Sequence, residues 1–444
     1  MAGVKKPIDA RGANRAGSDS GSLYAARIVD RELDELLGGV PAVSIEGAKG
    51  VGKTETARRR AATAFRLEDR AQRDIVAAEP GRLVTSDRPV LIDEWQRLPD
   101  TWDLVRRAVD DGAAPGSFLL TGSASRDDIS THSGAGRIVT VRMRPLSLAE
   151  RSLATPTVSL GRLLSGEHPP AVGTTDITLT TYVDEIVRSG FPGLRSSNGR
   201  ALRARLDGYI DRIVDRDFDE LGRTLRNPAT LRRWLNAYAA ASSTTASFEV
   251  IRDAATAGIA DKPAKVTTQL YRDVLERLWI IEPVPAWLPS ANPIARLSTP
   301  TKHQLADPAL AARLLGVDVA ALLDGVERGP AIPRDGTLLG HLFESLVTLS
   351  VRTYAQLSEA RVHHFRTRGG DHEIDLIIER ADHRIVALEV KLSATVDDAD
   401  LRHLRWLRQQ IGDDLLDIVV VTTGHDAYRT ADGIAVVPAA LLGP

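Results

Sequence analysis

The stretch Val43-Ser44-Ile45-Glu46-Gly47-Ala48-Lys49-Gly50-Val51-Gly52-Lys53-Thr54 decides the fold of the first part of this 444-residue chain. It has the pattern of a short apolar strand, a glycine-rich loop and the first turn of a helix. The loop satisfies the P-loop pattern of a glycine, four residues and then Gly-Lys-Thr. Glycines let the backbone approach phosphate oxygens closely, and the N–H groups of the loop and of the helix start then bind the anion. We therefore expect the loop to bind the phosphates of ATP through Gly47, Ala48, Lys49, Gly50, Val51, Gly52, Lys53 and Thr54.

Two side chains at the end of this loop have expected roles of their own. Lys53 should reach the β- and γ-phosphates, and the hydroxyl of Thr54 should ligate Mg²⁺. The alternative is a chance glycine turn before a helix, which the flanking strand and helix patterns disfavour.

A second apolar run, Pro89–Ile92, ends in Asp93 and Glu94. This pattern predicts a buried parallel strand whose carboxyl end opens at the ligand crevice. Asp93 should then hold Mg²⁺ through water, and Glu94 should orient or polarise the attacking water. A strand followed by an acidic helix cap is the alternative. The Asp-Glu pair begins 40 residues after Lys53, and this spacing favours an ATPase.

Two later positions are candidates for contacts with the γ-phosphate. The predicted strand 117–121 puts Thr121, or Ser123 just after it, where a polar sensor would belong. A Ser/Gly loop that caps the next helix is the alternative. Arg137 precedes the predicted strand 139–143 and is expected to contact phosphate, either in cis or across a subunit interface. A plain surface arginine is the competing interpretation.

The C-terminal part contains a different constellation. Asp375 lies on the predicted strand 373–379, with Ile374, Leu376 and Ile378 expected on the face opposite to it. Glu389 and Lys391 share one face of the next predicted strand, 385–392. An Asp on one strand and Glu-x-Lys on its neighbour are typical of restriction-endonuclease-like folds. Asp375 and Glu389 offer the hard oxygen ligands that suit Mg²⁺, and Lys391 would stabilise phosphate charge or position water. A surface salt-bridge cluster is the alternative.

Composition narrows the class of protein. The chain contains no cysteine, which excludes disulfides, thiolate metal sites and cysteine catalysis. Its formal net charge of −2 gives no overall field that would attract nucleic acid or a membrane. No apolar run reaches membrane-spanning length, and the N-terminus has no apolar signal core. We expect a cytoplasmic protein that binds ATP and Mg²⁺ and has no membrane partner; DNA as a partner and the oligomeric state stay open.

Several motifs together resemble one family, the bacterial and archaeal AAA-type ATPases of largely unknown function. They are Arg27-Ile28, 46–54, 91–94, 119–123, 136–138 and Pro145-Leu146-Ser147-Leu148-Ala149-Glu150. The resemblance implies an α/β fold: a P-loop NTPase parallel sheet of the AAA type, then a helical and winged-helix region, then a restriction-endonuclease-like α/β domain of unknown function. It also implies that Glu344, which matches an additional acidic position, completes the C-terminal metal site. Residues 302–307 match a short strand expected to be structural.

The expected domains follow from these patterns. They are a disordered tail at 1–22, the ATPase at 23–150, a linker or insertion at 151–180, the helical and winged-helix region at 181–300 and the C-terminal domain at 301–444. Predicted helices at 229–241, 247–257 and 264–278, followed by a wing strand from Trp279 to Ile281, would allow the last helix to enter a major groove. A helical module that only packs beside the ATPase is the alternative.

Three functions are compatible with the sequence. The first is a Mg²⁺-dependent ATPase coupled to a nucleic-acid-directed, nuclease-like domain. The second is an ATP-controlled binding switch with an inactive nuclease-like fold that cuts no DNA. The third, a structural protein with a decayed ATPase, is disfavoured because Lys53, Thr54, Asp93 and Glu94 are all present.

Overall fold

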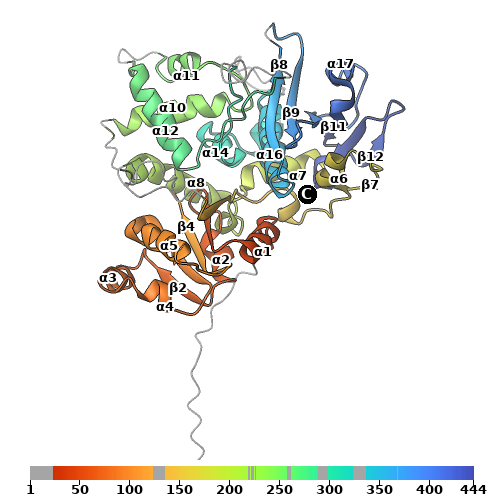
Figure 1. Cartoon of the computed structure of the whole chain (residues 1–444). Helices are drawn as coiled ribbons and strands as arrows, with labels where there is room; N and C mark the ends of the chain where they lie inside the picture. The colour runs from red at the N-terminus through yellow and green to blue at the C-terminus, as the bar shows by residue number, and fades with distance from the viewer. Residues whose placement is uncertain are drawn as a thin grey trace, which may run out of the picture.

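The computed structural model describes residues 24–123, 136–218, 221, 225, 227–257, 262–288, 299–323, 337–367 and 369–444. In Figure 1 an α/β part in red and orange lies below a helical part in green and a second α/β part in blue. The tail predicted at residues 1–22 lies outside the described residues. In the described part of the chain, no helix is long and apolar enough to cross a membrane.

The first part is built on a five-stranded parallel sheet with the strand order β2-β3-β4-β1-β5. The strands are β1 Ala42–Glu46, β2 Thr63–Arg66, β3 Val90–Asp93, β4 Phe118–Gly122 and β5 Ile138–Arg142. Every residue of β1, β3 and β4 is buried, as expected for a parallel sheet covered on both faces. The predicted parallel α/β sheet is therefore confirmed.

Helices cover both faces of this sheet. They are α1 Val29–Gly39, α2 Lys53–Arg58, α3 Arg70–Ala78, α4 Arg82–Thr85 and α5 Asp100–Asp110, with a 3₁₀ turn η1 at Trp95–Arg97. Leu33 of α1 and Ala57 of α2 pack with Val43 and Ile45 on one face. The helices α3 to α5 and η1 supply a second core on the other face. Because all five strands run in parallel, the loop after β1 meets the ends of β3 and β4 at one edge.

The helical part contains α7 Leu179–Arg188, α8 Gly199–Arg212, the π-helical turn η4 Ile213–Asp217, α10 Pro228–Ala240, α11 Phe248–Ala254, α12 Lys265–Arg277, α14 Pro308–Leu314 and α15 Val319–Leu323. Side-chain caps start α7, α10, α11 and α14. Asn227 accepts from the N–H of Thr230 before α10, and Asp307 accepts from the N–H of Ala309 before α14. A proline occupies the first turn of both helices.

The segment after α12 differs from a regular wing strand. Trp279 has φ 60°, a left-handed conformation that interrupts an extended chain. Beyond it, two isolated antiparallel bridges join Ile281 to Leu305 and Val284 to Lys302. The segments 281–284 and 302–305 thus form a narrow paired ribbon, which we call the bridge ribbon.

The C-terminal part has a seven-stranded mixed sheet with the order β7-β12-β13-β11-β10-β9-β8. The strands are β7 Gly173–Thr174, β8 Arg361–Arg366, β9 Glu373–Glu379, β10 Ile385–Val390, β11 Leu415–Thr422, β12 Asp426–Arg429 and β13 Ala435–Pro438. The long helix α16, Thr337–Leu357, packs on one face with Leu376 and Ile378. The helix α17, Arg402–Ile411, covers the other face with Ile377 and Ala387.

A bulge in β9 changes one predicted face. His363 pairs with Ile377 and Phe365 pairs with Ile374, so two residues of β9 lie opposite one residue of β8. The expectation that Ile374 shares a face with Leu376 and Ile378 is therefore wrong, because Ile374 packs with Ile377 in the core under α17.

The segment 151–180 contributes to the C-terminal part. Its strand β6, Val158–Ser159, pairs in parallel with β14, Leu442–Gly443, at the end of the chain. Its helix α6, Leu160–Ser165, contacts α16 and β11, and β7 pairs with β12. The last strands of the sheet are thus held by chain that leaves the first part.

Candidate functional site

The loop between β1 and α2 is shaped by glycines. A Cβ on Gly47 would lie 2.1 Å from the carbonyl oxygen of Met143, so only glycine fits against the chain that leaves β5. Gly50 and Gly52 have φ values of 85° and 103°, which L-residues with a side chain rarely adopt. Ala48 and Val51 are fully buried and anchor the loop in the core that contains Val43 and Ile45. The backbone therefore has the tight curvature expected of a phosphate-binding loop.

Lys53 spans this loop from the first turn of α2. Its ammonium donates to the carbonyl oxygens of Gly47 at 2.8 Å and Ala48 at 3.1 Å. Burial lowers the pKa of Lys53 to about 8, although the nearby carboxylates Glu94 and Asp93 act in the opposite direction. A bound polyphosphate would add negative charge at this point and favour the ammonium form.

Asp93, at the end of β3, gathers polar side chains from the start of α2 and the end of β4. Its Oδ1 accepts hydrogen bonds from the hydroxyl of Thr54 at 2.7 Å and from that of Thr121 at 2.5 Å. Thr121 in turn accepts from the backbone N–H of Glu94 at 3.1 Å. The structure thus brings together Thr54, Asp93 and Thr121. A hydroxyl and a carboxylate oxygen this close are a donor set that fits Mg²⁺.

Glu94 directly follows Asp93 and adopts a left-handed conformation with φ 56°. Its Oε2 accepts hydrogen bonds from Gln96 Nε2 at 2.5 Å and from the hydroxyl of Ser123 at 3.0 Å. Ser123 was one of the two predicted sensor positions, whereas the sequence analysis missed Gln96. The only sequence signal for Gln96 is its place two residues after Glu94.

Arg137 lies at the other edge of the sheet. The next residue, Ile138, pairs with Ala42 at the start of β1, whereas the loop leaves from the end of β1. Its Nε donates to Asp110 Oδ1 at 2.6 Å, at the end of α5. Arg137 therefore does not reach the loop of its own chain, and only the contact across a subunit interface stays a prediction.

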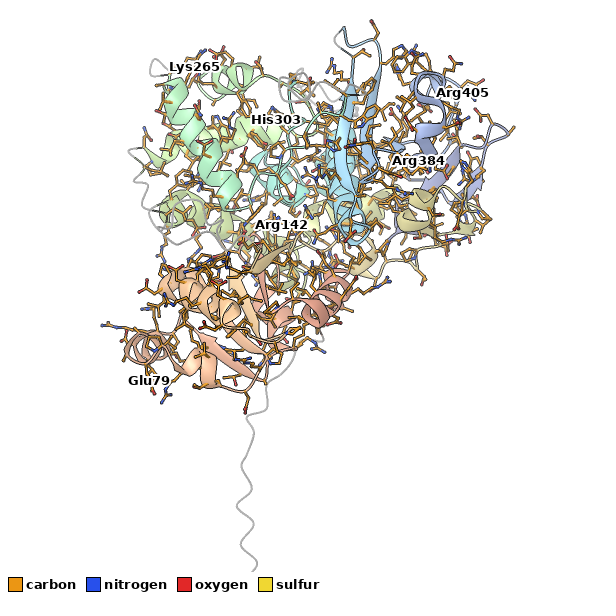
Figure 2. All side chains as sticks on the ribbon, viewed as in Figure 1. Glu79, Arg142, Lys265, His303, Arg384 and Arg405 are labelled. Carbon is orange, nitrogen blue, oxygen red and sulfur yellow. The ribbon has the colours of Figure 1, made fainter. Side chains whose placement is uncertain are left out.

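Two other arginines do lie at the loop: Arg27, which donates to the carbonyl oxygen of Val51 at 2.8 Å, and Arg142, which sequence reasoning missed. Arg142 ends β5 and donates to the carbonyl oxygen of Met143 at 3.1 Å, beside Gly47. Its guanidinium lies 4.0 Å from the ring centroid of Trp279, a cation–π contact with the helical part. Figure 2 labels Arg142 at the boundary between the first part and the remainder of the chain.

The helical part also covers the loop directly. The hydroxyl of Tyr209 donates to the carbonyl oxygen of Lys49 at 3.0 Å, and its ring lies 4.9 Å from that of Phe191. A cavity of about 80 Å³ remains beside them, and its lining includes Lys49, Gln96, Ser123 and Tyr209. A movement of the loop backbone at Lys49 would therefore displace Tyr209 of α8 or break this hydrogen bond.

Arg142 belongs to a cluster of charges that joins all three parts. Glu282 lies 2.6 Å from Arg144, 3.5 Å from Arg142 and 3.8 Å from Arg352 of α16. Burial acts to raise the pKa of Glu282, but the three arginines outweigh it and hold that pKa well below its usual range. The backbone N–H of Glu282 donates to the carbonyl oxygen of Gln304, across the bridge ribbon.

Lys302, on the same bridge ribbon, enters the predicted C-terminal site. Its ammonium donates to Glu344 Oε1 at 2.8 Å and Asp375 Oδ1 at 3.1 Å, and lies 3.6 Å from Glu373. Burial acts to lower the pKa of Lys302, which is 1% exposed, but the carboxylates outweigh it and raise that pKa. Sequence reasoning missed this contact and assigned residues 302–307 a structural role.

Glu389 and Lys391 complete this group. Lys391 Nζ lies 3.0 Å from Glu389 Oε1, and Asp375 Oδ2 accepts from the N–H of Val390 at 2.9 Å. Burial and the neighbouring Asp375 raise the pKa of Glu389 to about 8. Its Oε2 is buried and has no hydrogen-bond partner among the described residues. The structure thus brings together Glu344, Asp375, Glu389 and Lys391, with Lys302 among them.

No group of three or more His, Cys, Asp or Glu side chains in the described ranges is arranged to hold a metal ion. The ammonium of Lys302 lies between the two nearest carboxylates, Glu344 and Asp375, and holds them around itself. We refer to Lys302, Glu344, Asp375, Glu389 and Lys391 as the carboxylate site.

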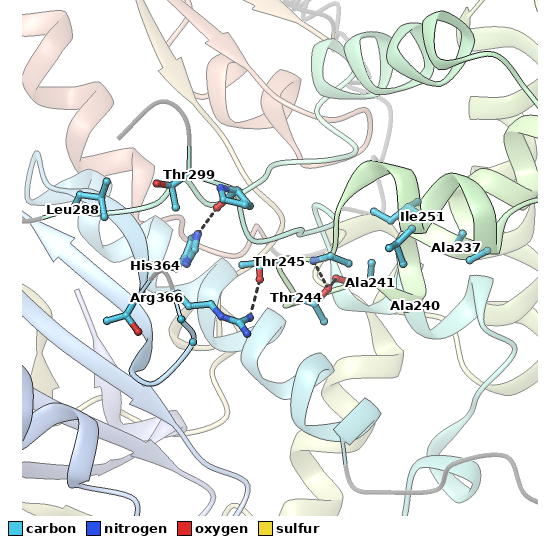
Figure 3. A pocket seen from close by; sticks show the side chains of 17 residues that line it. Ala237, Ala240, Ala241, Thr244, Thr245, Ile251, Leu288, Thr299, His364 and Arg366 are labelled. Carbon is cyan, nitrogen blue, oxygen red and sulfur yellow. Dashed lines mark hydrogen bonds between the residues drawn. The ribbon is translucent and has the colours of Figure 1, made fainter. Parts of the chain in front are cut away.

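A cavity of about 1100 Å³ lies between the helical part and β8 (Figure 3). Its lining includes His364, Arg366, Thr245 and Pro300. Arg366 donates to the hydroxyl of Thr245 at 3.0 Å and lies 3.6 Å from Glu373, the same glutamate that contacts Lys302. Arg366 of the cavity lining and Lys302 of the carboxylate site therefore both approach Glu373.

Three stretches of the chain match protein families. Residues 40–152 match an AAA domain, residues 179–321 match a domain of unknown function (DUF8612), and residues 339–442 match a second domain of unknown function (DUF4143). An uncharacterized protein of Mycobacterium tuberculosis and one of Mycobacterium bovis are each 27% identical to the chain over 427 residues. These matches cover 94% of this chain and 84% of each relative.

Two solved structures are also similar. A Walker-type ATPase of Pyrococcus abyssi superposes with a TM-score of 0.37 at 17% identity, over 64% of this chain and 94% of that chain. The ORC2 protein of Aeropyrum pernix, in ADPNP–ADP complexes, superposes with a TM-score of 0.28 at 16% identity, over 65% of this chain and 90% of that chain. The match over residues 40–152, together with the geometry of the loop and strand ends, supports an AAA-type P-loop ATPase domain in the first part of the chain.

Proposed function

We propose that the chain binds ATP with Mg²⁺, hydrolyses it, and couples this reaction to a nucleic-acid-directed, nuclease-like C-terminal part. The observation that carries the ATPase proposal is the pair of hydroxyls from Thr54 and Thr121 on one oxygen of Asp93. This pair places the end of the loop, the acidic strand end and the neighbouring strand end around one point, as phosphoryl transfer requires.

Each residue then has a defined task. Thr54 and Asp93 would hold Mg²⁺, which supplies positive charge to the phosphates when bound. Lys53 would exchange its contacts with loop carbonyls for contacts with phosphate oxygens. Glu94 would orient the attacking water and accept its proton, and Gln96 and Ser123 would position that carboxylate.

The ATPase assignment is tested with Glu94→Gln. We expect this variant to bind ATP like the parent and to hydrolyse it about 10²–10⁴-fold more slowly, because only the general base is removed. Glu55→Gln is the matched control, since Glu55 lies in the first turn of α2, next to Thr54, but pairs with Arg58 on the surface. If Glu94→Gln turns over at the parent rate, Glu94 is not the base.

The nuclease-like assignment of the C-terminal part is supported by the antiparallel pair β9–β10 and by helices on both faces of the sheet. Once the Lys302 ammonium had left Glu344 and Asp375, these two carboxylates and Glu389 would hold Mg²⁺, and the buried Oε2 of Glu389, which has no hydrogen-bond partner among the described residues, fits that role. Lys391 would stabilise charge on the phosphate. DNA cleavage is measured with Mg²⁺, with and without ATP; Lys391→Ala should lose any cleavage the parent shows.

A second candidate is an ATP-controlled binding switch that cuts no DNA. The position of Lys302 favours it, because its ammonium already pairs with both Glu344 and Asp375. The predicted winged-helix region offers few cations for DNA, since Lys262 pairs with Asp253 and Lys265 pairs with Glu249. DNA binding without cleavage, in every combination of Mg²⁺ and ATP, would select this candidate.

A further inference from the structure

We propose that the carboxylate site is a cation-exchange site, in which the ammonium of Lys302 and a hard divalent metal ion take the same carboxylate oxygens one at a time. This inference rests on the proposed metal-dependent function of the C-terminal part. It assigns Lys302 a function of its own: in the described form of the site, it is the resident cation.

The geometry of Lys302 is that of a bound cation and not of a surface lysine. Its side chain is 1% exposed, and its ammonium lies within 3.6 Å of three carboxylates that come from α16 and β9. Its backbone is held firmly, because Lys302 and Val284 exchange two hydrogen bonds of 2.8 and 2.9 Å in the bridge ribbon. The ribbon thus delivers one positive charge into the acidic site.

A second, independent observation points to a cation of higher charge than an ammonium. Glu389 Oε2 is buried and makes no hydrogen bond with any described residue, although Glu389 Oε1 lies 3.0 Å from Lys391. The antiparallel register ends at Leu388 and Leu376, so that Glu389 and Asp375 follow side by side. The site therefore holds a carboxylate oxygen that Lys302 leaves unused, and divalent ions recruit six or more oxygens.

The two cations exclude each other on electrostatic grounds. A divalent ion on Asp375 and Glu344 would lie within about 4 Å of the Lys302 ammonium, where charges of like sign repel strongly in a buried site. On withdrawal, the ammonium would move towards the cavity of about 1100 Å³, whose lining includes Thr299, Pro300 and His364. Metal binding and withdrawal of Lys302 are then one event.

The test is Mn²⁺ affinity of the full chain without nucleotide, measured by electron paramagnetic resonance of free Mn²⁺. Lys302→Met should bind Mn²⁺ at least about tenfold more tightly than the parent, because the competing charge is gone. Lys391→Met is the matched control: it also removes a lysine beside a carboxylate, but this lysine is 29% exposed and does not lie between Glu344 and Asp375. It should show a smaller gain than Lys302→Met. Adding Asp375→Asn to Lys302→Met should abolish the gain and so locate the ion.

An unchanged Mn²⁺ affinity in Lys302→Met would overturn the proposal. If Lys302→Met folds only when Mn²⁺ is present, the metal has replaced the lysine and the proposal is supported. A second measurement uses the parent chain: amine-reactive labelling of Lys302, read by peptide mass spectrometry, should increase as Mn²⁺ binds. Labelling that stays constant while Mn²⁺ binds would also overturn it.

The exchange and the proposed function fail in different ways. Tighter Mn²⁺ binding by Lys302→Met, with no DNA cleavage by any variant, keeps the exchange and removes the nuclease assignment. Metal-dependent cleavage by the parent, with an unchanged Mn²⁺ affinity in Lys302→Met, keeps the nuclease assignment and removes the exchange.

Discussion

Single side chains decide the chemistry at both ends of this chain, and Lys53 is the one on which ATP binding depends most directly. Its ammonium is buried and bonded to two carbonyl oxygens of the loop, 2.8 and 3.1 Å away. These bonds link the start of α2 back to the loop, and on ATP binding the ammonium would turn to phosphate.

We predict that Lys53→Ala weakens ATP binding at least about hundredfold, because charge-assisted hydrogen bonds to phosphate are lost. The fold should persist, since the loop backbone keeps its own contacts. Lys49→Ala is the control within the same loop, because the contact of Lys49 with Tyr209 is made by its backbone carbonyl, which the substitution keeps. Calorimetric titration with ATP checks both variants; equal affinity in Lys53→Ala and Lys49→Ala would contradict the role of Lys53.

The stability of the fold should depend on pH through His364. It is fully buried, its Nε2 lies 3.0 Å from the carbonyl oxygen of Pro300, and burial, with Lys302 nearby, lowers its pKa to about 4. The unfolded chain binds this proton at a pKa of about 6.5, so the contribution of His364 to stability is complete above pH 6.5 and is lost as the pH falls towards 4.

The unfolding free energy of the parent should fall between pH 7 and pH 4. We predict that in His364→Gln this fall is smaller by about 3 kcal/mol. The glutamine amide can still donate to Pro300, whereas it cannot take up a proton. Urea unfolding at the two pH values measures the difference. His425→Gln is the exposed comparison with the opposite sign: its hydrogen bond with Asp426 raises the pKa of His425, so this substitution should not reduce the loss at low pH. A parent and His364→Gln with the same pH dependence would refute the assignment.

At the scale of elements, the contact between the P-loop and the end of β5 sets the shape of the nucleotide site. Gly47 touches this chain so closely that an added Cβ would lie 2.1 Å from Met143 O and 2.8 Å from Arg142 Nη1. The first of these atoms is backbone and cannot turn away, so either β1 or β5 would have to shift.

We predict that Gly47→Ala lowers the unfolding free energy by about 1–3 kcal/mol, the range for overpacking in a rigid core, and abolishes ATP binding. Gly38→Ala is the matched control, because nothing lies within 4 Å of the added methyl group and alanine is the better helix former. It should leave stability unchanged or raise it by up to about 1 kcal/mol. Thermal unfolding and ATP titration check the pair; a Gly47→Ala that binds ATP would show that β5 yields.

The elements also show what sequence can and cannot predict here. The strands of the first sheet are predictable because a parallel sheet covered on both faces needs unbroken apolar runs, such as Val90–Ile92. Arg137 could not be placed from its position in the chain, because β5 lies parallel to β1 and so puts its first residues at the edge away from the loop. The two-residue strands β6 and β7 are too short to show any periodicity.

Lys302 was missed for a different physical reason. Its partners Glu344 and Asp375 lie 42 and 73 residues further along the chain, and only the packing of the bridge ribbon against α16 and β9 brings them together. Asp375 and Glu389, by contrast, lie on adjacent strands, so period-2 patterning was enough to predict that they meet.

At the scale of the whole molecule, the three parts share one continuous core. It extends from Val29 in α1 to Leu442 in β14 and includes residues of α8, α10 and α16. Polar contacts reinforce this core where the first part meets the last: Gln356 of α16 donates to Glu32 at 2.6 Å and to the carbonyl oxygen of Arg142 at 2.9 Å. Arg142 thus contacts both the chain beside the nucleotide loop and Gln356 of the C-terminal part.

Glu282 is the centre of this junction, because it is the carboxylate that Arg142, Arg144 and Arg352 all approach. We predict that Glu282→Gln lowers the unfolding free energy by about 3 kcal/mol, since three mostly buried guanidinium groups lose their common counter-charge. Glu249→Gln is the control; Glu249 is 48% exposed in its pair with Lys265 and should change stability by less than about 1 kcal/mol. Chemical unfolding of both variants measures the difference. Because Arg142 also holds the chain beside Gly47, Glu282→Gln should weaken ATP binding as well, whereas Glu249→Gln should not. A Glu282→Gln variant with the stability and ATP affinity of the parent would mean that the three arginines are solvated well enough to need no common partner, and the loop would then have to communicate with the C-terminal part by another route.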